Sequence, residues 1–284
     1  MLIAVAGGTG YVGQAVRDAL LAEGQRVRVI ARHHRPLPPE VEFVPVNLRQ
    51  GDLTAALAGV AAVINLVGII QENPRAGSTF KAMHVEVPRR IMAAMAQAGI
   101  RRYLHMSALG TRAQARSRYH QTKWEAEQLV RHSGLDWTIV RPSLMFGGGA
   151  DFFKTIAAQA RWPATPVPGD GRTPLQPVFR EDVARFFAAA VMDPATYGET
   201  FEIAGPDRMS LNALYSLVGR PAHPNLVHIP LAVLMTMARW GENLPGFPVT
   251  VDQLLMLGEA NVSDDTRWTA IAGPATPLHP DRLP

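Results

Sequence analysis

The stretch Met1-Leu-Ile-Ala-Val-Ala-Gly-Gly-Thr-Gly-Tyr-Val-Gly13 decides the fold of this 284-residue chain. Its apolar run, Leu2 to Ala6, ends at a cluster of glycines, and a helical pattern of apolar residues follows. This order predicts a buried strand, a tight turn and a helix. Glycines at every third position leave the turn without Cβ atoms, so backbone N–H groups and the positive helix end can approach a pyrophosphate. The residues predicted to bind it are Gly7, Gly10, Tyr11, Val12 and Gly13.

The composition is that of a soluble globular protein. Apolar residues make up 47% of the chain, which is ample for a core, and the apolar runs are too short for a signal peptide or a membrane span. The absence of cysteine excludes disulfides and thiolate metal sites, and no histidine pair has metal-binding spacing, so we expect no metal and a cytoplasmic location. The net charge of +4 is spread along the chain, so no nucleic-acid partner is expected.

Strand and helix patterns alternate along the first two thirds of the chain. Such alternation requires crossover connections and predicts an α/β fold with a doubly wound parallel sheet of the Rossmann type. The expected strands are residues 2–6, 26–31, 41–46, 61–67, 101–106, 135–141 and 199–204. The expected helices are the one whose apolar pattern runs through Val12, Val16, Ala19 and Leu20, and residues 52–57, 80–98, 119–132 and 181–191.

The pattern changes after Pro142. Prolines and glycines in residues 161–177 predict a long ordered loop, and residues 210–258 predict helices separated by proline-rich turns. We therefore divide the chain into a dinucleotide-binding domain, residues 1–142, and a smaller, mainly helical substrate-side region, residues 143–284. Residues 175–204 are expected to return to the sheet of the first domain.

The residues after the second strand indicate which dinucleotide binds. An NAD site needs a carboxylate there for the ribose 2′-hydroxyl, but this chain has Arg32-His-His-Arg35. A guanidinium suits a 2′-phosphate, so NADP(H) is favoured, with Arg32 as the first candidate ligand and Arg35 as the second. The alternative is that both are ordinary surface charges, which leaves NAD(H) open. By their position after the third and fourth strands, the further cofactor-binding candidates are Asn47, Leu48, Leu66, Val67 and Gly68.

A serine, a tyrosine and a lysine form the catalytic candidate. Tyr119 and Lys123 are four residues apart on a predicted helix and so share one face. The ammonium of Lys123 is expected to lower the pKa of the Tyr119 phenol toward the range of a general acid or base. Ser107 follows the fifth strand, where it can donate a hydrogen bond to the same substrate oxygen. The alternative is an ordinary exposed helix face.

These motifs together resemble the extended and atypical short-chain dehydrogenase/reductase superfamily. The resemblance rests on the glycine turn, Ser107-Ala-Leu-Gly110, Tyr119-x-x-x-Lys123 and Arg141-Pro-Ser143, and it covers Met1 to about Ala204. The branch most similar to this chain is that of the nucleotide-binding accessory subunit of respiratory complex I and its bacterial relatives. The stretch from Leu244 to Leu254 also resembles the tail of that branch.

The superfamily implies a role for several residues. Tyr119 would exchange the proton, Lys123 would bind the nicotinamide ribose, Ser107 would orient the substrate, and Pro142 and Ser143 would border the nicotinamide. The usual Asn-Asn-Ala-Gly of the superfamily is Asn65-Leu-Val-Gly68 here, and Asn47 replaces an acidic residue near the adenine, which weakens the case for a standard sugar-nucleotide enzyme.

Two functions remain open at this point. The first is an NADP(H)-dependent oxidoreductase acting on a carbonyl or alcohol of a quinone-like, sugar or lipid substrate. The second is a nucleotide-binding sensor or assembly subunit without turnover. The apolar helix predicted over residues 231–240 suits either burial or a peripheral membrane or respiratory-complex contact. The sequence predicts no oligomeric state.

Overall fold

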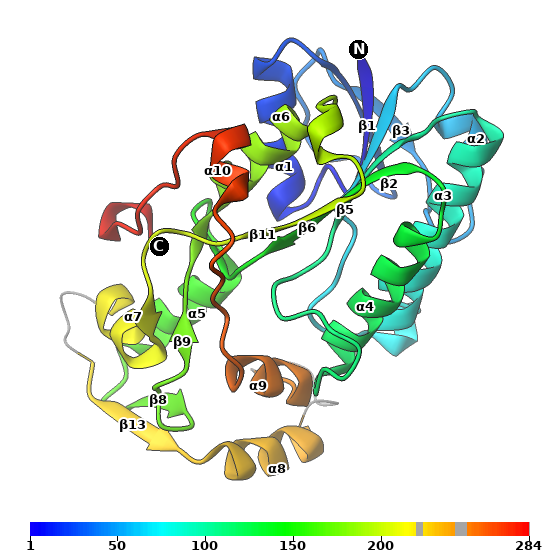
Figure 1. Cartoon of the computed structure of the whole chain (residues 1–284). Coiled ribbons are helices and arrows are strands. Elements are labelled where there is room, and N and C mark those ends of the chain that lie inside the picture. The colour runs from blue at the N-terminus through cyan, green and yellow to red at the C-terminus, as the bar shows by residue number, and fades with distance from the viewer. Residues whose placement is uncertain (220–223, 242–248, 284) are drawn as a thin grey trace.

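A computed structural model describes residues 1–219, 224–241 and 249–283 (Figure 1). Its centre is a parallel sheet of seven strands in the order β11-β6-β5-β4-β1-β2-β3. The strands are β1 (Leu2–Ala6), β2 (Arg26–Ala31), β3 (Glu42–Pro45), β4 (Ala62–Asn65), β5 (Arg102–Met106), β6 (Asp136–Pro142) and β11 (Glu199–Ile203). The order runs outward in both directions from the neighbouring strands β1 and β4, so the predicted doubly wound Rossmann sheet is confirmed.

Helices cover both faces of the sheet (Figure 1). One face packs against α1 (Tyr11–Ala22), α6 (Arg180–Ala190) and α10 (Arg267–Ala272). The other packs against α2 (Leu53–Ala56), α3 (Val87–Gln97) and α4 (Arg118–Arg131). Parallel strands buried on both faces must be apolar at successive positions, which explains why all five residues of β1 are buried.

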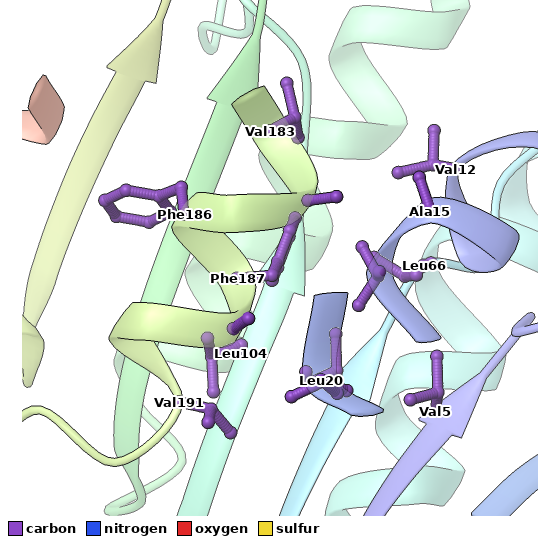
Figure 2. Packing of buried hydrophobic residues seen from close by; sticks show 14 of the residues in the cluster. Val5, Val12, Ala15, Leu20, Leu66, Leu104, Val183, Phe186, Phe187 and Val191 are labelled. Atoms are coloured by element: carbon purple, nitrogen blue, oxygen red, sulfur yellow. The ribbon is translucent and has the colours of Figure 1, made fainter. Parts of the chain in front are cut away.

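The contact between α1 and α6 is the centre of one core layer. Figure 2 shows Val183 and Phe187 of α6 together with Val12 and Leu20 of α1, and all four belong to one buried cluster. The Phe187 side chain is fully buried, which contributes about 2–3 kcal/mol relative to an exposed side chain. This packing fixes the start of α1, which follows the glycine turn.

The helix predicted over residues 80–98 is not uniform. It begins as a π-helical turn, Lys81–Glu86, and continues as α3. Pro88 stands at the second position of α3, directly after the π turn, where its missing N–H removes one backbone donor from the continuous helix. A π turn inserts an extra residue into a helix and often marks a functional site.

The remaining elements form a smaller region with its own buried cluster. They are β7 (Met145–Phe146), α5 (Asp151–Gln159), β8 (Thr165–Pro168), β9 (Pro174–Leu175), β10 (Val178–Phe179), β12 (Met209–Ser210), α7 (Leu211–Val218), β13 (Leu226–Ile229), α8 (Leu231–Gly241) and α9 (Val251–Leu257). Short 3-10 turns span Pro74–Ala76, Pro194–Thr196 and Pro280–Arg282.

Two expectations for this region are wrong in part. β8 and β9 lie within the stretch predicted as a loop, and β13 interrupts the stretch predicted as helices. β8 pairs only with β13, in a two-stranded sheet, so the prolines of β8 need not donate to a second neighbour. Residues 220–223 and 242–248, the latter including the first part of the tail-like stretch from Leu244, lie outside the described residues.

Candidate functional site

The glycine turn joins β1 to α1 and packs closely against the start of the helix. Gly7 has a φ of +82°, which favours glycine. A Cβ on Gly13 would lie 2.3 Å from the Gly7 carbonyl oxygen and 2.6 Å from the Gly8 Cα, so α1 packs directly on the turn. Only a chain with glycine at Gly13 can therefore bring the helix start so close to the turn.

The start of α1 is free of competing negative charge. Its N-cap residue, Gly10, supplies no side-chain cap, and the first turn contains no acidic residue. The unsatisfied N–H groups and positive dipole of a helix start form an anion site when no side chain neutralises them. The turn therefore fits a dinucleotide pyrophosphate, with Tyr11, Val12 and Gly13 presenting their backbone.

The Tyr11 side chain turns toward the C-terminal region. Its hydroxyl donates to the Gly147 carbonyl oxygen at 2.7 Å, and the Arg180 guanidinium lies 5.0 Å from the ring centroid. Burial raises the pKa of the phenol, so Tyr11 stays neutral. Arg180 is ion-paired with Glu181 and thus brings little net charge to the helix start.

The predicted residues after β4 lie against the same turn. A Cβ on Gly7 would be 3.3 Å from both the Leu66 carbonyl carbon and the Val67 nitrogen. Leu66 and Val67 are buried and Gly68 is exposed. Because β1 and β4 are the strands at which the sheet order reverses, this junction is where open α/β sheets bind ligands.

Two arginines that follow β2 have guanidinium groups without a partner in the described residues. Arg32 and Arg35 are exposed, and neither guanidinium has a hydrogen-bond or ion-pair partner in the described part of the chain. Asn47 Oδ1 accepts from the Arg49 backbone N–H at 3.1 Å, and the role of Asn47 at the adenine stays a prediction. Leu48 is half-buried against the core.

The catalytic candidates meet at the start of α4. The Tyr119 ring is half-buried, and its hydroxyl has no hydrogen-bond partner among the described residues. Lys123 is 1% exposed, lies 6.0 Å from the Tyr119 ring centroid and donates from Nζ to the Met106 carbonyl oxygen at 3.0 Å. Tyr119 and Lys123 therefore share one helix face, and the lysine reaches the carboxyl end of β5.

The expected lowering of the Tyr119 pKa is wrong for this environment. Burial raises the pKa of Tyr119 to about 12, and burial also lowers the pKa of Lys123 to about 8, an effect that Glu127 opposes. Desolvation disfavours the charged form of each group, and the Lys123 ammonium does not lower the phenol pKa. At neutral pH the phenol is protonated, which suits a proton donor better than a proton acceptor.

The other predicted residues are more enclosed. Ser107 is buried, and its hydroxyl is hydrogen-bonded to Thr111 Oγ1 at 3.3 Å. Ser143 is also buried, and its hydroxyl donates to the Gln176 carbonyl oxygen at 2.6 Å. The Pro142 carbonyl accepts from the Leu109 N–H at 2.9 Å. Their predicted roles stay predictions.

Two contacts of the Tyr119 helix could not be found by motif. The Asp252 carboxylate of α9 accepts from the backbone N–H groups of Arg118 (2.6 Å) and Tyr119 (3.4 Å). His84, in the π turn, is fully buried and lies edge-on to the Tyr119 ring at a centroid distance of 5.2 Å. Neither residue stands in a recognisable pattern, so only the fold brings them to the site.

Within residues 1–219, 224–241 and 249–283, no group of three histidine, cysteine or acidic residues is arranged to bind a metal ion. In the same ranges, no helix is long and apolar enough to cross a bilayer.

Comparison with known proteins identifies relatives of both the sequence and the fold. A family model described as NAD(P)H-binding matches residues 7–194. The rat mitochondrial NADH dehydrogenase (ubiquinone) 1 alpha subcomplex subunit 9 is 30% identical over 238 residues, which cover 80% of this chain and 63% of the rat protein. The chain thus spans less than two thirds of that relative's length.

Two solved structures share the fold. A nucleoside-diphosphate-sugar epimerase from Staphylococcus aureus superposes with a TM-score of 0.79 at 17% identity, covering 99% of each chain. A short-chain dehydrogenase/reductase superfamily protein from Agrobacterium tumefaciens, solved with bound NAD, has a TM-score of 0.72 at 20% identity and covers 99% of this chain and 94% of its own.

Proposed function

The chain belongs to the NAD(P)H-binding family, and from this membership we propose that it is an NADP(H)-dependent oxidoreductase of the short-chain dehydrogenase/reductase type. The observation that carries the proposal is the pairing of a bare glycine turn at the start of α1 with a half-buried tyrosine whose hydroxyl has no partner among the described residues. The first feature suits a dinucleotide, and the second leaves a proton donor free for substrate.

The phosphate preference is proposed from charge. Arg32 and Arg35 follow β2 without an acidic partner in the described chain, and no carboxylate stands between Ala31 and Pro39. A ribose 2′-phosphate would pair with an otherwise unpaired guanidinium, whereas a 2′-hydroxyl would lack its usual carboxylate. NADPH is therefore expected to bind more tightly than NADH.

The cofactor test compares stabilisation by the two dinucleotides. Arg32→Glu should weaken NADPH binding about 10- to 100-fold, since a charge-assisted hydrogen bond contributes about 1.5–3 kcal/mol, and should change NADH binding little. Thermal-shift titrations measure this, with Arg239→Glu on the distant α8 as the control of equal charge change (Figure 1). Equal protection by NADH and NADPH in the wild type would contradict the proposed preference.

The chemistry is proposed for the chain's own residues. A bound nicotinamide would supply or accept the hydride. The Tyr119 phenol, which is protonated at neutral pH, would give a proton to the substrate oxygen during carbonyl reduction. Ser107 would hold the same oxygen, and Lys123 would stabilise the phenolate left behind.

The activity test uses a panel of carbonyl substrates with NADPH. Tyr119→Phe should reduce turnover about 10²- to 10⁴-fold while leaving NADPH binding almost unchanged. Tyr215→Phe, which removes a phenol hydroxyl from α7 in the smaller region, is the matched control. A fully active Tyr119→Phe protein would rule out the proton-transfer role.

The relatives favour a second candidate, a nucleotide-binding subunit without turnover. The rat relative is a subunit of a larger enzyme, and such a protein would use the dinucleotide for stability. A ligand at a thousandfold excess over its Kd stabilises a fold by about 4 kcal/mol. This candidate predicts the same thermal shifts with NADPH but no turnover in any carbonyl assay, and a copurifying respiratory partner would support it.

A further inference from the structure

His84 occupies the one π-helical turn in the described part of the chain. The turn, Lys81–Glu86, precedes α3 and directs His84 inward, where its side chain is fully buried. A buried histidine must satisfy two ring nitrogens, so its partners show what it joins.

Both ring nitrogens have partners, and they come from different elements. Nδ1 lies 2.9 Å from Thr122 Oγ1, on the helix that carries Tyr119. Nε2 lies 3.2 Å from the nitrogen and 3.1 Å from the oxygen of Ile69, in the segment that follows β4. One imidazole therefore ties the catalytic helix to the segment expected to line the cofactor.

The ring also contacts the catalytic candidates. It lies edge-on to the Tyr119 ring at 5.2 Å between centroids and stacks on Phe80 at 5.3 Å. A Cβ on Gly68 would lie 3.2 Å from Lys123 Nζ and 3.8 Å from His84 Nε2, so the two nitrogens border the same space. A movement of the imidazole would therefore change the surroundings of both Tyr119 and Lys123.

The imidazole is neutral. Burial, and secondarily the Lys123 ammonium, lowers the pKa of His84 to about 2. A neutral ring can bond two elements without placing a second positive charge beside Lys123, which a lysine or arginine in its place would do.

Resting on the proposed function, we propose that His84 is the positioning residue of the site, holding the Tyr119 phenol and Lys123 Nζ in place against residues 66–70. Its hydrogen bonds to Thr122 and Ile69 perform this task, and its ring packing alone does not. Without those bonds the segment after β4 separates from α4, and water reaches the phenol.

The test separates the ring from its hydrogen bonds. His84→Phe keeps an aromatic ring but loses both bonds, whereas His84→Gln loses the ring but keeps an amide where Nε2 lies. Thr122→Val removes the partner of Nδ1 without changing the buried histidine, which covers the case in which His84→Phe does not fold. His228→Phe, on β13, is the matched control.

The readout is the ionisation of Tyr119 in the full-length, cofactor-free protein. With ¹³Cζ-labelled tyrosine, NMR resolves the five tyrosines, and Tyr119→Phe assigns the resonance. In His84→Phe and Thr122→Val, the titration midpoint of Tyr119 should fall from about 12 toward the ordinary value of 10. In His84→Gln, which like Thr122→Val loses only the bond between Nδ1 and Thr122, it should fall by a similar amount, whereas in His228→Phe it should stay close to the wild-type value.

The outcomes separate this inference from the proposed function. An unchanged Tyr119 titration in both His84→Phe and Thr122→Val, with only a lower melting temperature, would show a purely structural histidine. A shifted titration in a protein without turnover would keep the positioning role and discard the oxidoreductase. With turnover present, the same two variants should lower kcat about tenfold.

Discussion

The two ends of the candidate site are built from different materials. The phosphate end is backbone: the glycines from Gly7 to Gly13 and the uncapped start of α1. The other end, where the nicotinamide ring would lie, is here called the ring end. It consists of side chains, of which Lys123 is almost fully buried and Tyr119 is half-buried. Backbone amides carry no net charge and cost far less to desolvate than an ammonium, whose burial lowers stability. The phosphate end thus depends on the absence of side chains at the glycines of the turn, and the ring end depends on the electrostatics of buried groups.

The largest effect is expected at the phosphate end. Gly13→Ala places a methyl group 2.3 Å from the Gly7 carbonyl oxygen, so α1 must move away from the turn. We expect a loss of about 3 kcal/mol in the free energy of unfolding and loss of NADPH binding, measured by urea denaturation and isothermal titration. Gly10→Ala, whose Cβ would have a single close neighbour at 3.2 Å, should lose much less. Similar losses in both variants would show that space does not govern this end.

The second prediction concerns the cost of the buried lysine. Lys123→Met should abolish turnover and raise the free energy of unfolding at pH 7 by about 1–3 kcal/mol, because it removes a desolvated ammonium. The pKa of Lys123 is about 8 in the fold and 10.5 ordinarily, so between these values the unfolded chain binds the extra proton and wild-type stability rises with pH.

The difference in the free energy of unfolding between Lys123→Met and the wild type should therefore shrink as the pH increases from 8 to 10.5. Chemical denaturation at several pH values measures the difference. Lys154→Met, which changes a lysine whose side chain is 55% exposed, should show neither effect. A Lys123→Met protein that is less stable than the wild type at pH 7 would mean that the ammonium stabilises the site.

The smallest effect is expected at the contact between α9 and α4. Asp252→Ala removes the carboxylate that accepts from the Arg118 and Tyr119 N–H groups, and an N-terminal helix acceptor contributes about 1 kcal/mol. Asp264→Ala, which changes a side chain that is 96% exposed, should change stability by less than about 0.5 kcal/mol. Thermal melts compare the two variants. Equal changes in melting temperature would show that the Asp252 contact from α9 does not stabilise the ring end.

The sequence predicted the phosphate end more fully than the ring end, for a physical reason. A glycine turn between a strand and a helix is local, so Gly7, Gly10 and Gly13 can be recognised by spacing alone. The doubly wound parallel sheet was predicted in the same way from alternating strand and helix patterns, and the structure confirmed it. The smaller region was predicted less well. Its strands β8 and β13 are short, β8 contains prolines and β13 is partly exposed, and the two strands pair with each other although they are far apart in the sequence.

The ring end depends on contacts that no local pattern encodes. The spacing of Tyr119 and Lys123 was visible in the sequence, but the direction of the tyrosine pKa shift was not, because it is set by burial. His84 looked like one more position on a helix until the π turn directed it inward. Spacing identifies which residues are candidates, whereas the surrounding packing sets their protonation.

The bond from Asp252 to the start of α4 also has a consequence for chain growth. Tyr119 and its carboxylate acceptor are separated by 133 positions, whereas the glycine turn is complete within the first 13 residues. During synthesis, α1 can pack on α6 only after residue 190 has been made, and the tyrosine helix receives the Asp252 acceptor later still, when nearly nine tenths of the polypeptide is complete. The core that holds the phosphate end can therefore form before the last contact of the reactive end.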